Sequence, residues 1–358
     1  MLKPLHYKGR GGGSNRSGRF EAHSREAEDD GWGNQDAELP PLATETLLDA
    51  SKTVINYNDS PDIPFDRSIN PYRGCEHGCI YCFARPSHAY LGLSPGLDFE
   101  SRILVKPNAA EILRRELSKR NYQCAPIALG SNTDPYQPLE REHQIMRQIL
   151  QVLLETRHPL GIVTKSALIE RDIDLLSELA QRRLVNVCVS VTTLDRELAR
   201  RMEPRAAAPQ RRLQAIKTLT QAGIPVHLML APLIPGLNDE EMESIVTAAH
   251  AAGADSANFI FIRLPLEVAE LFQEWLHRHY PLKAERVLSL IKQSRGGKLY
   301  DPNFHQRFTG QGVYADLLKQ RFHLICKKLG LNQPKPPLRT DLFRKPELSG
   351  QMSFDFFD

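Results

Sequence analysis

The sequence predicts an α/β fold in which short apolar strands alternate with amphipathic helices. Five apolar runs have the length and composition of buried strands: Ile127–Gly130, Gly161–Thr164, Asn186–Val191, Val226–Leu230 and Asn258–Ile262. The segments between them carry apolar residues at helical spacing. Strands and helices that alternate at this pace form βα units and a parallel sheet. Successive right-handed crossovers curl such a sheet into a complete or partial barrel.

The spacing of apolar residues and the residue types at helix ends predict the helices between these strands. Residues 142–155 and 171–183 each place apolar side chains on one helical face. Pro209 suits the first turn of a third helix, which Gly223 ends, and Asp239 is a suitable N-cap for a fourth. A flat doubly wound sheet is the alternative architecture, but no Gly-rich dinucleotide fingerprint follows the first strand.

Composition and charge narrow the classes of protein that remain. The chain has 358 residues, of which 41% are hydrophobic and 25% are charged, as in ordinary globular proteins. No apolar run approaches the roughly 18 residues that span a bilayer, and residues 1–13 lack the apolar stretch of a secretory signal. We therefore expect a cytoplasmic protein with no membrane partner. Six cysteines are too few for a disulfide scaffold, and clustering of three favours metal chemistry.

The chain divides into four predicted segments. Residues 1–60 read as a poorly ordered tail, because a basic and then an acidic stretch lack apolar periodicity. Residues 61–280 form the α/β core. Residues 281–331 form a helical C-terminal extension, which is basic because ten Lys and Arg residues face three acidic residues between positions 283 and 328. Residues 332–358 are predicted to be a flexible, Pro-rich tail.

The three clustered cysteines have the spacing C-x3-C-x2-C: Cys75, Cys79 and Cys82. Three thiolates so close in sequence can converge on one small inorganic body, and Gly74 and Gly78 allow the tight turns that this requires. A cubane iron–sulfur cluster normally takes four Cys ligands, so three would leave one iron open. The alternative is a closed Cys3His zinc site that recruits His77 or His88, although such sites usually come as two separated pairs. Both metals suit thiolate ligands.

The cysteine triplet, with Tyr81 before its third member, resembles the signature of the radical S-adenosylmethionine (SAM) superfamily. Four further stretches resemble the branch that includes spore photoproduct lyase and its DNA repair photolyase-like relatives: residues 70–75, 131–137, 164–166 and 203–205. The resemblance covers about residues 60 to 330.

This resemblance implies a partial (β/α)6 barrel of the radical SAM type and a [4Fe–4S] cluster held by Cys75, Cys79 and Cys82. The amino and carboxylate groups of SAM would chelate the fourth iron. An electron from the reduced cluster would then cleave SAM to methionine and a 5′-deoxyadenosyl radical, which takes a hydrogen atom from the substrate. The protein's part is to position the cofactors and to exclude competing reactions.

The same resemblance indicates where SAM binds. Lys165 matches the branch's Thr-Lys motif at a strand end and is the candidate partner of the SAM carboxylate. Ser190 resembles the branch's ribose-contacting serine. Thr133 and Asp134 stand where much of the superfamily carries a Gly-Gly-Glu element, and are the candidates for the amino group. Tyr81 is expected beside the adenine. Each residue also has a structural alternative: Lys165 caps a strand, Ser190 is a polar residue within the sheet, and Tyr81 supports the cysteine loop.

The substrate is less well indicated than the cofactors. Ser131 stands where spore photoproduct lyases carry the cysteine that returns a hydrogen atom to the product radical. Because a serine hydroxyl is a poor hydrogen-atom donor, thymine-dimer repair does not carry over and the catalytic residues stay unassigned. We expect a radical SAM enzyme, of lyase or DNA repair type, that acts on DNA or another nucleic-acid-derived substrate. The alternatives are radical modification of a different substrate and a non-catalytic, zinc-stabilised nucleic-acid-binding module.

Two segments suggest macromolecular partners. The basic extension interleaves Tyr300, Phe304, Phe308 and Tyr314 with its cations, a pattern that can hold phosphates and stacked bases; a helical cap with a solvated face is the alternative. The chain's last residues resemble a sliding-clamp-binding peptide: Gln351, Phe354, Phe356 and Phe357. Docking of this tail on its own domain is the alternative. The resemblance also implies an electron donor, a reductase or a flavodoxin-type protein.

Overall fold

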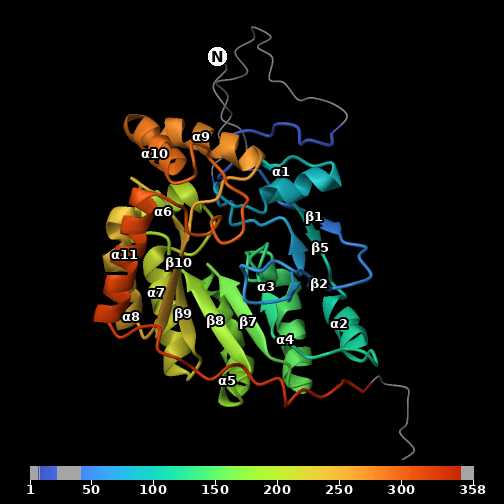
Figure 1. The fold of residues 1–358 in the computed structure, drawn as a ribbon. Helices are drawn as coiled ribbons and strands as arrows, with labels where there is room; N and C mark the ends of the chain where they lie inside the picture. The colour runs from blue at the N-terminus through green and yellow to red at the C-terminus, as the bar shows by residue number, and fades with distance from the viewer. Residues whose placement is uncertain (1–6, 8, 22–41, 348–358) are drawn as a thin grey trace, which may run out of the picture.

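A seven-stranded sheet forms the centre of the molecule in a computed structural model that describes residues 7, 9–21 and 42–347 (Figure 1). Its strand order is β10-β9-β8-β7-β6-β3-β2. Six strands are mutually parallel: β3 Arg67–Ile69, β6 Ile127–Leu129, β7 Leu160–Thr164, β8 Val185–Ser190, β9 Val226–Leu233 and β10 Ser256–Phe261. Strand β2, Ile55–Tyr57, runs antiparallel along β3. The predicted partial barrel and its five apolar strands are confirmed.

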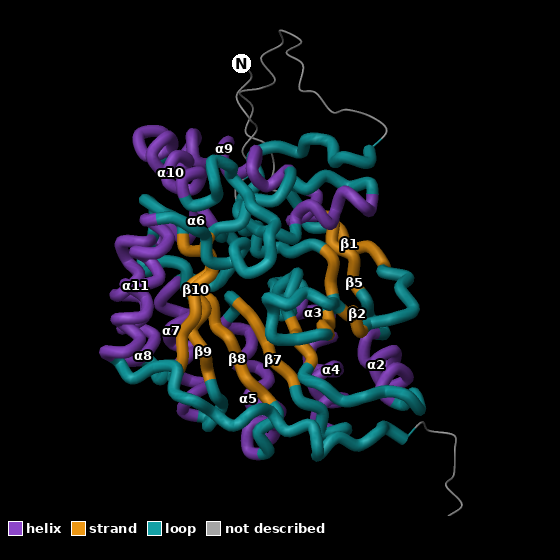
Figure 2. Tube along the Cα trace, viewed as in Figure 1, coloured by secondary structure: helices purple, strands orange, loops and turns teal. Residues whose placement is uncertain are grey.

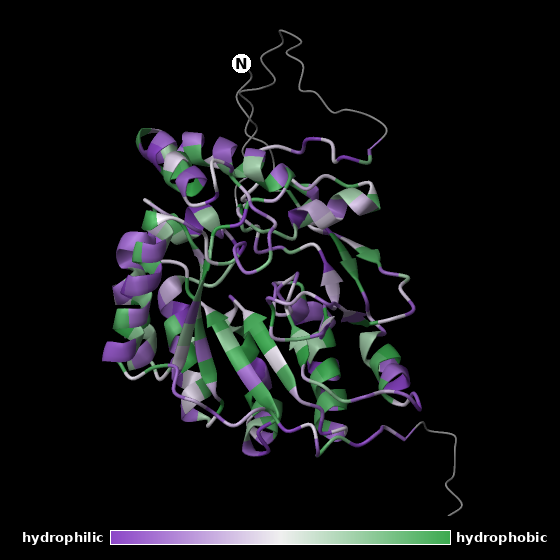
Figure 3. Ribbon diagram, viewed as in Figure 1, coloured by the Kyte–Doolittle hydropathy of each residue, from purple (hydrophilic) through white to green (hydrophobic). Residues whose placement is uncertain are grey.

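Helices follow the strands and cover the outer face of this sheet, as Figure 2 shows. They are α2 Ala109–Leu117, α4 Ile145–Glu155, α5 Ile173–Gln181, α7 Pro209–Gln221 and α8 Met242–Ala251. Three short helices lie in the loops: α1 Asp98–Ser101 before β5, α3 Glu140–His143 before α4 and α6 Arg196–Met202 before α7. The strands are predominantly apolar (Figure 3), and Ile162, Val187 and Val226 have no exposed surface. Ile162 pairs with Val187 and Val187 with Val226 in parallel register, so these β-branched side chains share one buried face of the sheet.

A small second sheet supports the segment that carries the cysteines. Strand β5, Arg102–Val105, pairs in parallel with β1, Glu45–Leu48, and antiparallel with β4, Tyr72–Arg73. Strand β4 lies directly between β3 and the first cysteine, so this sheet fixes where the cysteine loop leaves the barrel.

Helices α10 Pro281–Gln293 and α11 Val313–Lys328 lie in the predicted C-terminal extension. Helix α9, Glu267–His279, precedes them within the range predicted for the core. No helix in the described residues is long and apolar enough to cross a membrane.

The prediction of a poorly ordered tail over residues 1–60 is wrong for the described part of that range. Strands β1 and β2 lie in it, and residues 10–13 are buried. These residues pack through polar contacts, which apolar periodicity does not reveal: Arg10 donates through Nη1 to the carbonyl of Glu100 and through Nη2 to that of Leu42.

The prediction of a flexible tail is also wrong for residues 332–347. The backbone N–H of Arg339 donates to the carbonyl of Arg183, and that of Arg344 donates to the carbonyl of Thr156. The ring of Phe343 lies 5.6 Å from that of Tyr122 and 5.3 Å from that of His158, measured between centroids. The peptide-like motif formed by Gln351, Phe354, Phe356 and Phe357 lies outside the described residues.

Truncation of Phe343 tests whether this segment stabilises the barrel. We expect Phe343→Ala to lower the free energy of unfolding by about 1–2 kcal/mol, because the half-buried ring loses apolar burial and two aromatic contacts. Chemical denaturation measures the change. Leu282→Ala is the control, since Leu282 is 101% exposed. Equal stability of the Phe343 variant and the unmodified protein would contradict the packing described here.

Candidate functional site

The three cysteines lie on a tight loop between β4 and the 3-10 helix Arg85–Leu91. Two glycines permit its path: Gly74 has a φ of +89° and Gly78 a φ of +65°. A Cβ atom on Gly74 would lie 2.9 Å from the carbonyl oxygen of Phe99, and one on Gly78 would lie 2.6 Å from Glu100 Oε2. Both positions therefore require glycine for conformation and for space. The short turns bring the three thiols to one side of the barrel.

The thiols are shielded from solvent. Cys75 and Cys79 are buried and Cys82 is half-buried. Burial raises the pKa of each thiol, that of Cys79 to about 12. All three are free of disulfides. A metal or cluster that binds here must displace the thiol protons, as thiolate ligation always requires.

A buried arginine fixes the backbone of the cysteine loop. Arg85 has no exposed surface, and its guanidinium donates to the carbonyls of Cys79 at 2.9 Å, Gly78 at 3.2 Å and Gly96 at 2.8 Å. It also pairs with the buried carboxylate of Glu100. Sequence reasoning missed both residues, although an arginine three positions after the last cysteine was a usable signal.

Residues 10–13, called the strap below, lie behind the cysteine loop. The backbone N–H of Gly11 donates to Glu100 Oε2 at 2.9 Å, and that of Gly12 donates to Glu100 Oε1 at 2.7 Å. A Cβ atom on Gly11 would lie 1.9 Å from the carbonyl oxygen of Gly78. The strap and Arg85 thus both bind the carboxylate of Glu100. The backbone of the strap also contacts the backbone of the cysteine loop at Gly78.

Asp134 links the cysteine loop to two strand ends. Its carboxylate accepts from Thr164 Oγ1 and the Lys165 N–H, both at 2.7 Å, and lies 3.3 Å from His77 Nδ1. Burial alone would raise the pKa of Asp134, but His77 and these hydrogen bonds hold it at about 2. Thr133 Oγ1 donates to the Tyr72 carbonyl. Both side chains are engaged by the protein, so contact with SAM stays a prediction for them.

Tyr81 and Ser190 meet at a second buried network. The Tyr81 hydroxyl donates to Glu203, which also accepts from Thr192 Oγ1 at 3.0 Å and pairs with Arg212. Arg212 Nη1 donates to the Ser190 carbonyl at 3.1 Å, and Ser190 Oγ donates to the Ala231 carbonyl at 3.2 Å. The network joins the cysteine loop to the ends of β8 and β9. Glu203 belongs to residues 203–205, which resemble the photolyase-like branch, but its contacts with Tyr81 and Arg212 were not predicted from the sequence.

Lys165 differs from the other candidates because its side chain has neither a hydrogen-bond nor an ion-pair partner among the described residues. It is half-buried, and its Nζ lies 5.9 Å from the centroid of the Tyr81 ring. Burial would raise the pKa of Glu203, but the charges of Arg212 and of Lys165 lower it; Arg212 is the residue that forms the salt bridge with Glu203. An ammonium group beside the cysteine loop is therefore available to an anionic ligand.

The histidines proposed for a zinc site are engaged elsewhere. His77 faces Asp134, and His88 Nε2 lies 3.0 Å from the Arg102 carbonyl oxygen. Within the described ranges no three side chains of His, Cys, Asp or Glu converge closely enough to hold one metal ion.

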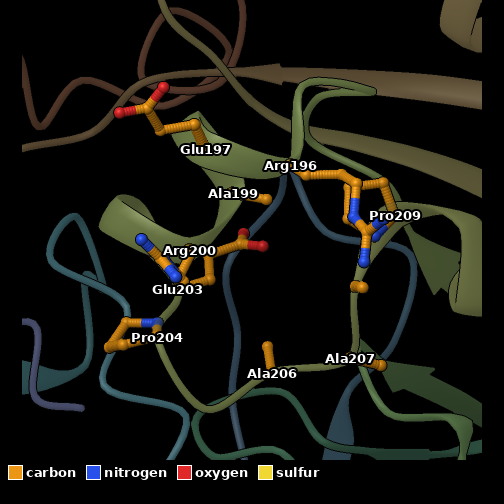
Figure 4. A pocket seen from close by; sticks show the side chains of 10 residues that line it. Arg196, Glu197, Ala199, Arg200, Glu203, Pro204, Ala206, Ala207 and Pro209 are labelled. Atoms are coloured by element: carbon orange, nitrogen blue, oxygen red, sulfur yellow. The ribbon is translucent and has the colours of Figure 1, made fainter.

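Two pockets flank the loop between α6 and α7. One, of about 490 Å³, is lined by Arg196, Arg200 and Glu203 among others, as Figure 4 shows. The second, of about 390 Å³, is lined by His77 and Arg205 among others and so reaches the cysteine loop. In the first pocket Glu197 and Glu203 balance the two arginines. The second is lined by Arg141, Arg205 and Arg211 and by no acidic residue of the described ranges, so its wall suits an anionic ligand, although Arg205 and Arg211 pair with Glu76 and Glu170.

Comparison with known proteins identifies relatives across most of the chain. A sequence model of the Radical SAM superfamily matches residues 69–249. An uncharacterized protein of Mycobacterium tuberculosis strain H37Rv is 36% identical over 280 residues, which are 77% of this chain and 78% of the relative. An uncharacterized protein of Methanocaldococcus jannaschii is 28% identical over 220 residues, 61% and 78% of the two chains.

The fold also resembles that of solved structures. Spore photoproduct lyase complexed with dinucleoside spore photoproduct superposes with a TM-score of 0.56 and 15% sequence identity, over 79% of this chain and 78% of that one. At this identity the likeness concerns the fold alone.

Substitution of Gly11 tests whether the strap supports the cysteine loop. We expect Gly11→Val to lower the iron bound after anaerobic reconstitution by at least about half, because the new side chain would collide with the Gly78 carbonyl and displace the loop. Gly161→Ala is the control, since nothing lies within 4 Å of a Cβ atom there. Unchanged iron content in the Gly11 variant would show that the loop does not depend on the strap.

Proposed function

Because this chain belongs to the radical SAM superfamily, we propose that it is an enzyme that acts on DNA or another nucleic-acid-derived substrate through a cluster held by Cys75, Cys79 and Cys82. The cofactors of the family are a [4Fe–4S] cluster and SAM. The observation that carries the assignment of ligands is three free, shielded thiols on one glycine-shaped loop, with no fourth cysteine in the same loop.

The residues around the loop fit these cofactors. Thiolates are the usual ligands of iron–sulfur clusters, and three of them leave one iron open to SAM. When bound, the reduced cluster supplies the electron that cleaves SAM and yields the radical that abstracts hydrogen.

We assign the surrounding side chains to binding and positioning. Lys165 binds the SAM carboxylate, since its ammonium lies over the Tyr81 ring and has no carboxylate partner among the described side chains. Ser190 contacts the ribose, and Tyr81, held by Glu203, packs beside the adenine. Thr133 and Asp134 contact the SAM amino group, and Asp134 also positions the loop through His77. Burial of these groups excludes water, which protects a reactive radical from side reactions.

Two observations favour a nucleic-acid-derived substrate. The pocket that reaches the cysteine loop is lined by Arg141, Arg205 and Arg211, which complement phosphate. The structure also shares its fold with a lyase solved with a dinucleoside ligand. The hydrogen-return step of that lyase is not part of this proposal, because Ser131 Oγ accepts a hydrogen bond from Asn70 at 3.1 Å and no thiol stands there.

Cysteine replacement tests the ligand assignment. We expect Cys75→Ala, Cys79→Ala and Cys82→Ala each to reduce SAM cleavage at least about 100-fold, because the cluster loses a ligand. Chromatography of 5′-deoxyadenosine measures cleavage. Cys124→Ala is the matched control: this half-buried cysteine precedes the amino end of β6, whereas the cysteine loop follows the carboxyl end of the neighbouring parallel strand β3, and the variant should retain full activity. Full activity of any triplet variant would refute the assignment.

Isotope transfer tests the substrate class. We expect deuterium from uniformly labelled DNA to appear in 5′-deoxyadenosine after incubation with SAM and the reduced enzyme, because the radical abstracts hydrogen from its substrate. Mass spectrometry measures the label. SAM cleavage without transfer from DNA, RNA or nucleotides would retain the radical enzyme but reject a nucleic-acid-derived substrate.

A further inference from the structure

A row of alternating aromatic rings and guanidinium groups runs outward from the cysteine loop. Its members, called the stacking ladder below, are Phe83, Arg263, Phe308, Arg307 and Phe304. The guanidinium carbon of Arg263 lies 4.8 Å from the ring centroids of both Phe83 and Phe308. That of Arg307 lies 4.8 Å from the centroid of Phe308 and 4.9 Å from that of Phe304. Each contact is within the range of cation–π interactions.

The ladder starts at the place where the chemistry of this family occurs. Phe83 directly follows Cys82, and Arg263 lies two residues beyond the carboxyl end of β10. Active sites of barrels gather at the carboxyl ends of their strands. In Figure 1 the connection between α10 and α11, which carries Phe304 and Phe308, crosses in front of this end of the barrel.

Buried contacts hold the ladder in place. Arg295 is 2% exposed and donates to the carbonyls of Ile262, Gln306 and Arg307 at 2.8 to 2.9 Å. The backbone N–H of Phe261 donates to the Phe308 carbonyl at 2.8 Å. The connection that bears the aromatic rings is thus tied to β10, so little conformational entropy would be lost when a ligand stacks on it.

The ladder also presents aromatic surface and charge to solvent. Phe83 is 41% exposed and Phe304 is 50% exposed. Arg307 pairs with Asp62, but Arg263 has no carboxylate partner among the described residues, and its Nε is buried without a hydrogen bond. A ligand that supplies both flat rings and anionic groups complements this combination.

We propose that the stacking ladder binds a single-stranded or locally unpaired stretch of nucleic acid and guides it to the cysteine loop. Bases stack on the open faces of Phe304 and Phe83, and a phosphate pairs with Arg263. Aromatic stacking combined with cationic contacts is how proteins hold unpaired strands without sequence preference. This inference rests on the proposed function and names the surface that would deliver the substrate.

Fluorescence anisotropy of a labelled oligothymidylate of about twelve nucleotides, a length in the range of single-strand sites, tests the proposal with the full-length holoenzyme. We expect Phe304→Ala to weaken binding about fivefold or more, with no change in its salt dependence. We expect Arg263→Gln to weaken binding and to reduce the slope of log affinity against log salt by about 0.7, because one phosphate contact is lost.

Tyr57→Ala is the matched control and should bind as the unmodified protein does. Tyr57 is 63% exposed beneath the guanidinium of Arg67 at 5.3 Å, but it pairs with the start of β3, at the opposite edge of the sheet. Iron content and SAM cleavage of each variant verify that the fold and the cluster are intact.

The binding experiment distinguishes failure of the stacking ladder from failure of the proposed substrate class. If the unmodified holoenzyme binds the oligonucleotide and both ladder variants bind equally well, the ladder is overturned while the proposed function stands. If the unmodified holoenzyme cleaves SAM but binds neither single-stranded nor duplex DNA or RNA, the nucleic-acid-derived substrate and the ladder both fail, and a peptide or small metabolite becomes the class to test.

Discussion

The buried ion pair between Arg85 and Glu100 is the interaction on which the site depends. Neither side chain has exposed surface, so removal of one partner would leave an uncompensated charge and cost about 3–5 kcal/mol. The pair does more than stabilise the fold, because Arg85 holds the carbonyls of Gly78 and Cys79. The strap donates to both oxygens of Glu100. Thiol placement is therefore coupled to a segment more than sixty residues earlier in the chain.

A second buried pair, Glu203 with Arg212, organises the other side of the same loop. It joins Tyr81 to the carbonyl of Ser190 and so connects the cysteine loop to the carboxyl end of β8. The face of the sheet that carries Ile162, Val187 and Val226 is apolar and buried, but the loops at the carboxyl ends of the strands contain buried carbonyls that need hydrogen-bond donors. Buried arginines supply several donors each in a fixed geometry. This arrangement keeps the rim of the barrel rigid around reactive chemistry.

Patterns that are local in sequence predicted the barrel and the cysteine loop. Apolar runs such as 226–230 indicate buried parallel strands, and the cysteine spacing limits which ligands can converge. Contacts between distant polar groups leave no such pattern, which is why the strap and residues 332–347 were misjudged. The partners of Asp134 also require three dimensions, since His77 and Thr164 approach it from separate elements. The run of glycines in the strap did carry a signal, because close backbone approach excludes a Cβ atom at Gly11.

The central claim is that Cys75, Cys79 and Cys82 hold a cluster with one iron open to SAM. Electron–nuclear double resonance on the reduced protein tests it most directly, with SAM labelled by ¹⁵N in its amino group and by ¹⁷O in its carboxylate. The account predicts hyperfine coupling of both labels to the cluster, as expected when these groups are bound to iron. A fully assembled cluster that shows no coupling to either label would contradict it.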